Sequence, residues 1–321
     1  MTIWIGGIYL KVGIPKSLMY YDYHILWKSF FEELGIEVIT STNTNKDILN
    51  HGVKNSVDEA CLPVKVFHGH VESLKDKVDY IFIPKMISVS KGEYNCPKIL
   101  GLPDMIKHSI KDLPEIIDVK VDMLSSSVSL IDSVMKIGNY FTDNKIKILK
   151  AYYIALKKHN AHKAASQEKN NKKKGLNIMV VGHSYNIYDE HISMNTIKKL
   201  KQQHINVITP EDIDQKRISY YSKQVSKRMF WTCGKTIVGS TFSAMYEQQV
   251  DGIIYMSSFG CGLDSILEDI IRRKAKRLNI PHTLLTIDEH SGEAGVNTRI
   301  EAFIDMINWR AQNETNISSH G

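Results

Sequence analysis

The four cysteines of the chain, Cys61, Cys96, Cys233 and Cys261, have surroundings that favour chemistry over simple packing. Cys261 stands between two glycines, after an apolar strand pattern and before a helical pattern. Glycines allow a tight turn that leaves the sulfur uncovered, and a following helix N-terminus favours the thiolate over the thiol. Cys261 is therefore a candidate metal ligand or nucleophile. The alternative is a free cysteine buried in a turn, since free cysteine packs as a small apolar residue.

Four cysteines are too few for a disulfide scaffold in a chain of 321 residues, so metal binding or redox chemistry explains them better. Structural zinc sites usually use close pairs such as C-x2-C, and this sequence has none. Thiolates spread over a long chain fit an iron–sulfur cluster held at a domain interface better. The residues by themselves leave three options open, which are a cluster, zinc and no metal.

Apolar runs and helical periodicity predict alternating strands and helices, which is typical of an α/β protein. The predicted strands are 8–14, 36–40, 78–84, 177–182 and 252–256. The predicted helices are 23–34, 64–77 and 266–278, and residues 104–162 are expected to be mostly helical.

The two halves of the chain resemble each other. Tyr21-Asp22-Tyr23-His24 is echoed by Tyr188-Asp189-Glu190-His191, and Val78-Asp79 by Val250-Asp251. Cys61 and Cys233 lie 172 residues apart, as do the two Val-Asp pairs. We therefore predict two Rossmann-like lobes related by an internal repeat, with additional helices between them. Ligands collect outside the C-terminal ends of strands in such sheets, so all four thiols could converge on one metal centre.

This pattern predicts an N-terminal Rossmann-like lobe over 1–110, a helical segment with a Lys-rich linker over 111–175, and a C-terminal Rossmann-like lobe over 176–321. The net charge is +6, and much of it falls in the lysine-rich stretch 163–174. We interpret this stretch as a solvated linker and expect no nucleic-acid partner. No apolar run approaches the roughly 18 to 20 residues of a membrane span, and no signal sequence is evident. We expect a cytoplasmic protein without a membrane partner.

Four motifs carry a resemblance to a known family. They are Asp-Glu-Ala-Cys-Leu-Pro-Val-Lys at 58–65, Tyr-Asn-Cys-Pro-Lys at 94–98, Phe-Gly-Cys-Gly-Leu-Asp-Ser at 259–265 and Asp-Glu-His-Ser-Gly-Glu-Ala-Gly at 288–295. With them the chain resembles the family of 2-hydroxyacyl-CoA dehydratases and their activases, specifically the component formerly called a domain of unknown function. The likeness extends from Lys11 to about Asn308.

The resemblance implies a cofactor and a partner. In the wider superfamily, which includes benzoyl-CoA reductases and double-cubane cluster proteins, two Rossmann-like lobes hold an iron–sulfur cluster through three cysteines. An ATPase partner with its own cluster supplies low-potential electrons. Carried over by position, the likeness implies Cys61, Cys96 and Cys261 as ligands of a 4Fe-4S or larger cluster. Cys233 departs from the family pattern, which has an aromatic residue there, and it is a candidate fourth ligand. An iron without a protein ligand can bind substrate, whereas full thiolate ligation favours electron transfer.

We therefore expect an iron–sulfur redox protein that receives electrons from an ATP-dependent activase and reduces a small molecule or passes the electrons on. A homo-oligomer is compatible with this function. The alternatives are a non-catalytic scaffold or maturation protein that carries a cluster or zinc, and a thiol-based binding module without metal. Gly234-Lys235-Thr236 looks like the end of a P-loop, but Met229 stands where that motif needs glycine, so we expect no ATP hydrolysis by this chain.

Two histidines are additional candidates. His183 and His290 both follow strand-like segments on the side where the cleft is expected, and acidic residues Asp288, Glu289 and Glu293 surround the second. These side chains could donate protons or bond to the ligands of a metal, and loop capping is the alternative.

Overall fold

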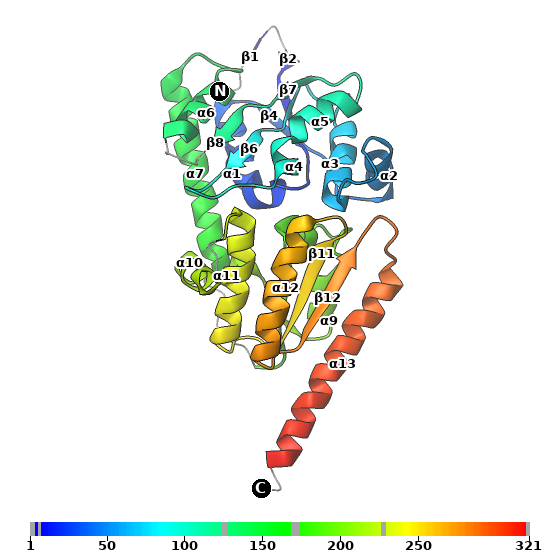
Figure 1. The fold of residues 1–321 in the computed structure, drawn as a ribbon. Helices are drawn as coiled ribbons and strands as arrows, with labels where there is room; N and C mark the ends of the chain where they lie inside the picture. The colour runs from blue at the N-terminus through cyan, green and yellow to red at the C-terminus, as the bar shows by residue number, and fades with distance from the viewer. Residues whose placement is uncertain (1–3, 6–7, 123–127, 168–173, 226–228, 319–321) are drawn as a thin grey trace.

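The computed structural model describes residues 4–5, 8–122, 128–167, 174–225 and 229–318, and it shows a mixed α/β fold with two four-stranded parallel sheets. In Figure 1 the N-terminal half lies above the C-terminal half, and the last helix, α13 (Glu293–Ser318), runs downward past the rest of the molecule. The predicted α/β class is therefore confirmed.

The first sheet belongs to the N-terminal half and has the strand order β4-β3-β5-β7. All of its neighbouring strands are parallel. The strands are β3 (Lys11–Ile14), β4 (Glu37–Thr40), β5 (Tyr80–Phe82) and β7 (Glu115–Ile117). Two small sheets accompany it, an antiparallel pair of β1 (Trp4–Ile5) with β2 (Ile8–Tyr9) and a parallel pair of β6 (Lys85–Ser88) with β8 (Lys120–Asp122).

The second sheet has the strand order β10-β9-β11-β12 and is also parallel throughout. Its strands are β9 (Asn177–Gly182), β10 (Asn206–Ile208), β11 (Gly252–Ser258) and β12 (His282–Ile287). In both sheets the strand that comes second in the chain is at one edge, followed by the first, third and fourth. Every residue of β9 is buried, as expected for a parallel strand covered by helices on both faces.

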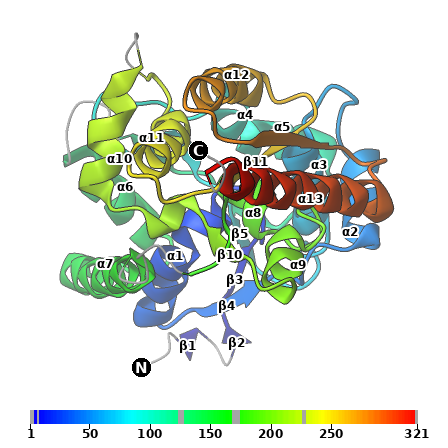
Figure 2. The same cartoon turned by 90° about the horizontal axis from the view of Figure 1, so that it is seen from below.

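Helices cover both faces of each sheet. The first sheet packs against α1 (Tyr20–Leu34), α6 (Val128–Gly138) and α7 (Lys145–Gln167) on one face, and against α3 (Leu62–Glu72) and α5 (Leu102–Ser109) on the other. Figure 2 shows α7 beside α1. The buried side chains of α1 recur every three to four residues, which turns one face of the helix toward this core.

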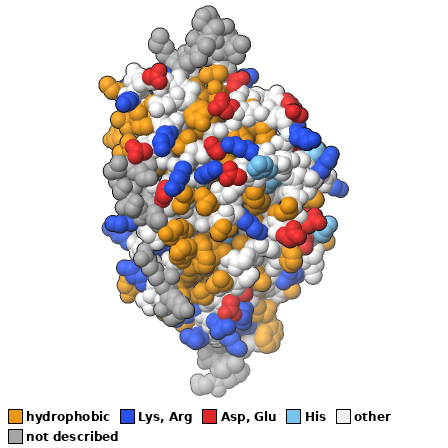
Figure 3. Space-filling model, turned by 45° about the horizontal axis from the view of Figure 1, so that its top comes forward, with side chains coloured by type: hydrophobic (Ala, Val, Ile, Leu, Met, Phe, Trp, Pro, Cys, Tyr) orange, Lys and Arg blue, Asp and Glu red, His pale blue; other side chains and the backbone are white. Residues whose placement is uncertain are grey.

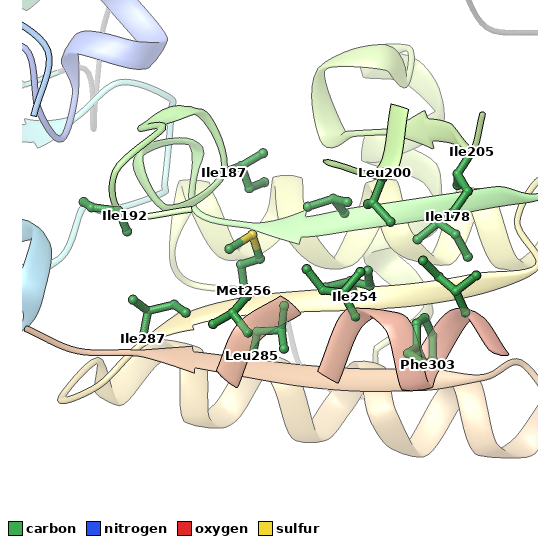
Figure 4. Packing of buried hydrophobic residues seen from close by; sticks show 14 of the residues in the cluster. Ile178, Ile187, Ile192, Leu200, Ile205, Ile254, Met256, Leu285, Ile287 and Phe303 are labelled. Atoms are coloured by element: carbon green, nitrogen blue, oxygen red, sulfur yellow. The ribbon is translucent and has the colours of Figure 1, made fainter. Parts of the chain in front are cut away.

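The second sheet is covered by α13 and α9 (Thr196–Gln202) on one face, where α2 (Lys46–Lys54) and α3 of the other half also contribute. Figure 4 shows Ile178, Ile254, Leu285 and Phe303 from β9, β11, β12 and α13 packed together in this layer. On the opposite face lie α10 (Gln215–Tyr221), α11 (Thr232–Tyr246) and α12 (Gly262–Arg277). Short helical segments complete the fold: α4 (Pro97–Leu100), α8 (Ser184–Tyr188), η1 (Pro210–Asp212) and η2 (Ser222–Gln224). No helix among the described residues has the length and apolar character that a membrane span requires.

The prediction of a mostly helical stretch over 104–162 is wrong at residues 115–122, which form β7 and β8. β7 pairs with β5, and its Ile117 has no exposed surface. Pairing and burial in the sheet outweigh the weak local preference of so short a segment. The predicted strand 8–14 is divided into β2, which pairs with β1, and β3, which belongs to the first sheet. The predicted strand 177–182 is found as β9, and the other predicted strands and helices are found with shifted ends.

Helices α2 and α3 touch through two glycines. A Cβ atom built on Gly69 would lie 1.8 Å from the carbonyl oxygen of Ile48, and one on Gly52 would lie 2.0 Å from that of Lys65. Only hydrogen fits at either place, so the backbones approach closely. This contact holds α3, whose N-terminus carries Cys61.

We predict that Gly69→Ala destabilises the protein by at least about 1–3 kcal/mol, because the added methyl group must push the two helices apart. The measurement is the free energy of unfolding from urea denaturation. Gly295→Ala on α13 is the matched control, since no atom lies within 4 Å of its Cβ position and alanine favours the helix. Equal stabilities of the two variants would contradict the close helix contact.

Candidate functional site

All four cysteines line one cavity of about 540 Å³, which residues of both halves of the chain surround. Cys61 and Cys96 come from the N-terminal half, and Cys233 and Cys261 come from the C-terminal half. Each thiol is free and partly buried. The structure therefore brings together the complete set of sequence-predicted site residues, and their role as metal ligands stays a prediction.

Each cysteine lies at the beginning of a helix. Cys61, Cys96 and Cys261 directly precede α3, α4 and α12, and none of these side chains caps its helix with a hydrogen bond. Cys233 is the second residue of α11. Backbone N–H groups at a helix start carry partial positive charge, which stabilises a thiolate or a bound anionic group. α3, α11 and α12 are long enough to supply this effect, while α4 has only 4 residues.

The turn around Cys261 crosses to the other half of the molecule. Gly260 has a φ of +76°, a left-handed conformation that glycine adopts at little cost. A Cβ atom at this glycine would lie 3.7 Å from Cα of Cys61, so the turn packs directly on the backbone there. Burial raises the pKa of Cys61, Lys98 opposes the rise, and the nearby Cys261 and Cys96 thiols add to it. The three thiols are thus close enough for each to feel the charge of another.

The segments that carry Cys96 and Cys233 are also joined to each other. The backbone N–H of Tyr94 donates to the Phe230 carbonyl at 3.0 Å, and the N–H of Thr232 donates to the Tyr94 carbonyl at 3.1 Å. The rings of Tyr94 and Phe230 stack with centroids 4.4 Å apart. This isolated parallel bridge holds the second pair of cysteines across the interface.

His183 forms a buried contact at the cysteine site. It follows β9, is only 5% exposed, and its Nε2 lies 3.9 Å from Sγ of Cys261 and 3.4 Å from Oδ1 of Asp264. Burial by itself would lower the pKa of His183, but the Asp264 carboxylate and the thiols of Cys233 and Cys261 outweigh burial and raise it. With this raised pKa His183 carries a proton on Nε2, the atom that faces Sγ of Cys261.

Asp264 holds this histidine in place. The carboxylate has no exposed surface and accepts a hydrogen bond from the Tyr255 hydroxyl at 2.8 Å and one from the Ser258 backbone N–H at 3.4 Å. One donor atom from each of His183, Cys261 and Asp264 lies within 4.8 Å of the other two. The set offers nitrogen, sulfur and oxygen ligands to a metal ion.

The loop of His290 lies apart from the cavity. The Asp288 side chain accepts from the His290 backbone N–H at 3.0 Å and from the Ser291 hydroxyl at 2.7 Å, which caps the loop. Glu289 pairs with the buried Lys65 at 2.5 Å. None of these residues, all of them described, is among those that line the cavity.

The same cavity contains polar residues that no sequence pattern marks as part of a site. They are Asp22 of α1, His159 and Lys163 of α7, and Glu211 of η1. Asp22 was visible as part of the repeated Tyr-Asp-x-His pattern, but nothing in the sequence separated it from surface acids. Glu211 and the two α7 residues have no local motif, and only the packing of α7 against α1 and η1 brings them here.

Asp22 and Asp189, which match each other in the predicted repeat, both accept hydrogen bonds from the opposite half of the chain. The Ser184 hydroxyl donates to Asp22 at 2.9 Å, and the Tyr21 hydroxyl donates to Asp189 at 3.1 Å. Thr44 also donates to Asp189. The buried Asp189 carboxylate therefore ties the second half to two segments of the first.

The fold and the cavity define a class of protein, one with two parallel α/β sheets and a thiol-lined cavity at their junction. Residues 11–213 match the family described as CoA enzyme activase uncharacterised domain, and residues 120–307 match 2-hydroxyglutaryl-CoA dehydratase, D-component. Each match covers more than half of the chain, so the chain belongs to the family related to 2-hydroxyacyl-CoA dehydratases and their activases. No curated protein matches it. The resemblance read from the cysteine motifs is confirmed.

We predict that Asp189→Ala destabilises the protein by about 2–4 kcal/mol, because it removes a buried acceptor and leaves its donors without a partner. Chemical denaturation gives the free energy of unfolding. The adjacent exposed residue provides the control, and Glu190→Ala is expected to change stability by less than about 0.5 kcal/mol. If the two variants are equally stable, Asp189 does not hold the halves together.

Proposed function

We propose that this protein is an iron–sulfur redox protein whose cysteines hold a 4Fe-4S or larger cluster between its two lobes. The observation that carries the proposal is the convergence of all four thiols, from four separate segments, on one cavity. Cys61, Cys96 and Cys261 are the proposed ligands, and Cys233 is the candidate fourth. A bound cluster would supply one-electron chemistry at low potential.

The surroundings of the thiols fit such a group. A cluster with thiolate ligands is anionic, and the helix starts of α3, α11 and α12 direct their N–H groups toward the region of the cysteines. His183 adds a hydrogen bond to sulfur, a contact that tunes potential. Apolar side chains of Leu18, Val64 and Leu263 complete the wall and limit the access of water.

We propose that the electrons come from an ATP-dependent activase with its own cluster. Both matched family descriptions name CoA-enzyme components, one an activase and one a dehydratase. Gly234-Lys235-Thr236, the stretch that resembles a P-loop, begins helix α11, but Met229 stands where that motif needs its first glycine, which supports ATP hydrolysis by a partner. Electrons would then reduce a small molecule or pass onward.

The surface near the thiols suits contact with such a partner. Leu100, Phe230 and Phe259 lie close in sequence to three of the cysteines and are exposed, Phe259 by 67%. Figure 3 shows apolar side chains gathered on the middle of one face, with charged side chains above and below them. Exposed aromatic and aliphatic side chains of this kind are typical of protein interfaces.

We also propose that the two lobes are an internal repeat. The shared strand order of the two parallel sheets supports this origin, and so do the matched positions of Asp22 and Asp189. On this proposal the lobes are 1–110 and 176–321, with 111–175 between them. β7 of the intervening segment completes the first sheet.

Zinc carried by a non-catalytic scaffold or maturation protein is the second candidate. The group of His183, Cys261 and Asp264 favours it, because nitrogen, sulfur and oxygen ligands within 4.8 Å suit a single zinc ion. Zinc would depend on His183 and not on Cys61 or Cys96. The two candidates therefore differ in which residues they need.

The cluster proposal predicts that protein purified without oxygen is coloured and contains iron and acid-labile sulfide. Cys61→Ala, Cys96→Ala and Cys261→Ala are each expected to lose most of the iron, because each removes a ligand. Visible spectra with iron, sulfide and zinc assays are the measurement, and Ser109→Ala, at an exposed position of α5 outside the cavity, is the control. A colourless, iron-free protein after anaerobic reconstitution would refute the proposal. Zinc that is lost in His183→Ala would establish the second candidate.

Cys233→Ala is expected to keep nearly all of its iron if three cysteines hold the cluster. In that case one iron lacks a protein ligand and is open to substrate. The measurement is the number of iron atoms per chain in Cys233→Ala, compared with the number in Cys61→Ala. Loss of the cluster in Cys233→Ala would show a fourth obligatory ligand and would favour electron transfer as the function.

A further inference from the structure

The cavity that holds the thiols also contains a group of titratable side chains that are not proposed as metal ligands. Asp22, Lys163 and Glu211 line it together with the four cysteines. Tyr23 lines the same cavity, and burial, followed by the charges of Asp22 and Cys233, raises the pKa of its hydroxyl. A molecule at the thiols is thus within the same cavity as two carboxyl groups.

Asp22 keeps its proton to a higher pH than an ordinary aspartate. Burial raises its pKa, and the hydrogen bond from Ser184, the Lys163 ammonium and the nearby His183 only partly oppose this rise. The residue nevertheless retains accessible surface, and as a lining residue it turns this surface to the cavity. An acid of this kind can donate a proton into the cavity.

Glu211 is placed to exchange protons with solvent. The residue has exposed surface, but partial desolvation of its carboxyl group by the surrounding protein raises its pKa to about 7, with the charge of Asp22 as the second cause. The hydrogen bond with Tyr188 and the charge of Lys163 act in the opposite direction. A carboxyl group that titrates near neutral pH both gains and loses protons readily under physiological conditions.

The remaining charged groups around the pair support this role. Nζ of Lys163 lies 5.6 Å from the centroid of the Tyr23 ring, and its charge stabilises whichever acid has given up a proton. His159 stacks on the same ring at 5.9 Å, and burial lowers its pKa to about 4, so it is neutral at physiological pH. His183 faces Asp22 from the start of α8, and Asp212 faces Glu211 within η1.

We propose that Asp22 and Glu211 deliver protons to a small unsaturated molecule that is reduced beside the cysteines. The inference rests on the proposed redox function and adds the source of the protons. Reduction of one multiple bond consumes two electrons and two protons. The electrons come singly from the low-potential donor that serves the cysteine site. Asp22 gives each proton as its O–H bond breaks and a bond from hydrogen to substrate forms, and Glu211 then returns a proton from solvent to Asp22.

The first test uses the full chain without iron and measures carboxyl protonation by infrared spectroscopy. Ordinary aspartates are ionised at about pH 6, whereas carboxyl groups with raised pKa values keep a protonated band to higher pH, so we expect one such band from Glu211 and a separate one from Asp22. Asp22→Asn should abolish the Asp22 band, and Glu211→Gln should abolish a titration near pH 7. Asp132→Asn and Glu37→Gln, at exposed sites outside the cavity, should change neither. If the spectrum of Asp22→Asn matches the wild type as closely as that of the control Asp132→Asn does, the inference is overturned.

The second test uses protein loaded with iron anaerobically and measures its reduction potential across pH. Proton uptake that accompanies reduction makes the wild-type potential fall as pH rises, and Asp22→Asn should lose this dependence while it keeps its iron. An unchanged dependence in Asp22→Asn would overturn proton delivery with the cluster proposal intact. A protein that binds no iron would instead refute the proposed function itself, and the iron assay distinguishes the two failures.

Discussion

Contact between the two halves of the chain is the constraint on which the rest of the structure depends. Neither half contains the complete set of thiols, so the cavity exists only because the halves are held together. The Gly260 turn packs on the backbone of Cys61, and the Tyr94 strand segment bonds to the segment before Cys233. Asp189 and Asp22 accept hydrogen bonds across the same interface. These contacts are directional, and together they fix the positions of the thiols relative to one another.

Helix starts and His183 shape the electrostatics around the thiols. Three long helices begin at cysteines, so their partial positive charge meets the sulfurs. Nε2 of His183 faces both the Cys261 thiol and the buried Asp264 carboxylate. The same arrangement suits an anionic cluster and, through its mixed ligands, a zinc ion. The two family matches are consistent with the proposed cluster, in which Cys233 would either be the fourth ligand or leave one iron without a protein ligand.

Much of the fold could be predicted because strands and helices of an α/β protein leave a strong periodic signal. β9 and β11 were predicted from continuous apolar runs, and both are buried central strands. β7 and β8 are not predicted, because a strand of 3 residues is too short to show a strand pattern within a sequence whose neighbouring residues have a helical pattern. Their structure comes from pairing with β5 and β6, partners that lie more than thirty residues earlier in the chain.

The sequence by itself determined which residues could bind a metal. The sequence contains the four cysteines, the glycines beside Cys261 and the similar spacing in the two halves. The motifs around these cysteines also identified the family. Only the tertiary structure decided what surrounds the thiols. His183 meets Asp264 because the loops after β9 and β11 emerge at the same edge of one sheet. Asp22 and Glu211 share a cavity because α1, α7 and η1 pack together. Burial and proximity shift the pKa values of these carboxyl groups, and neither can be read from residue type or spacing.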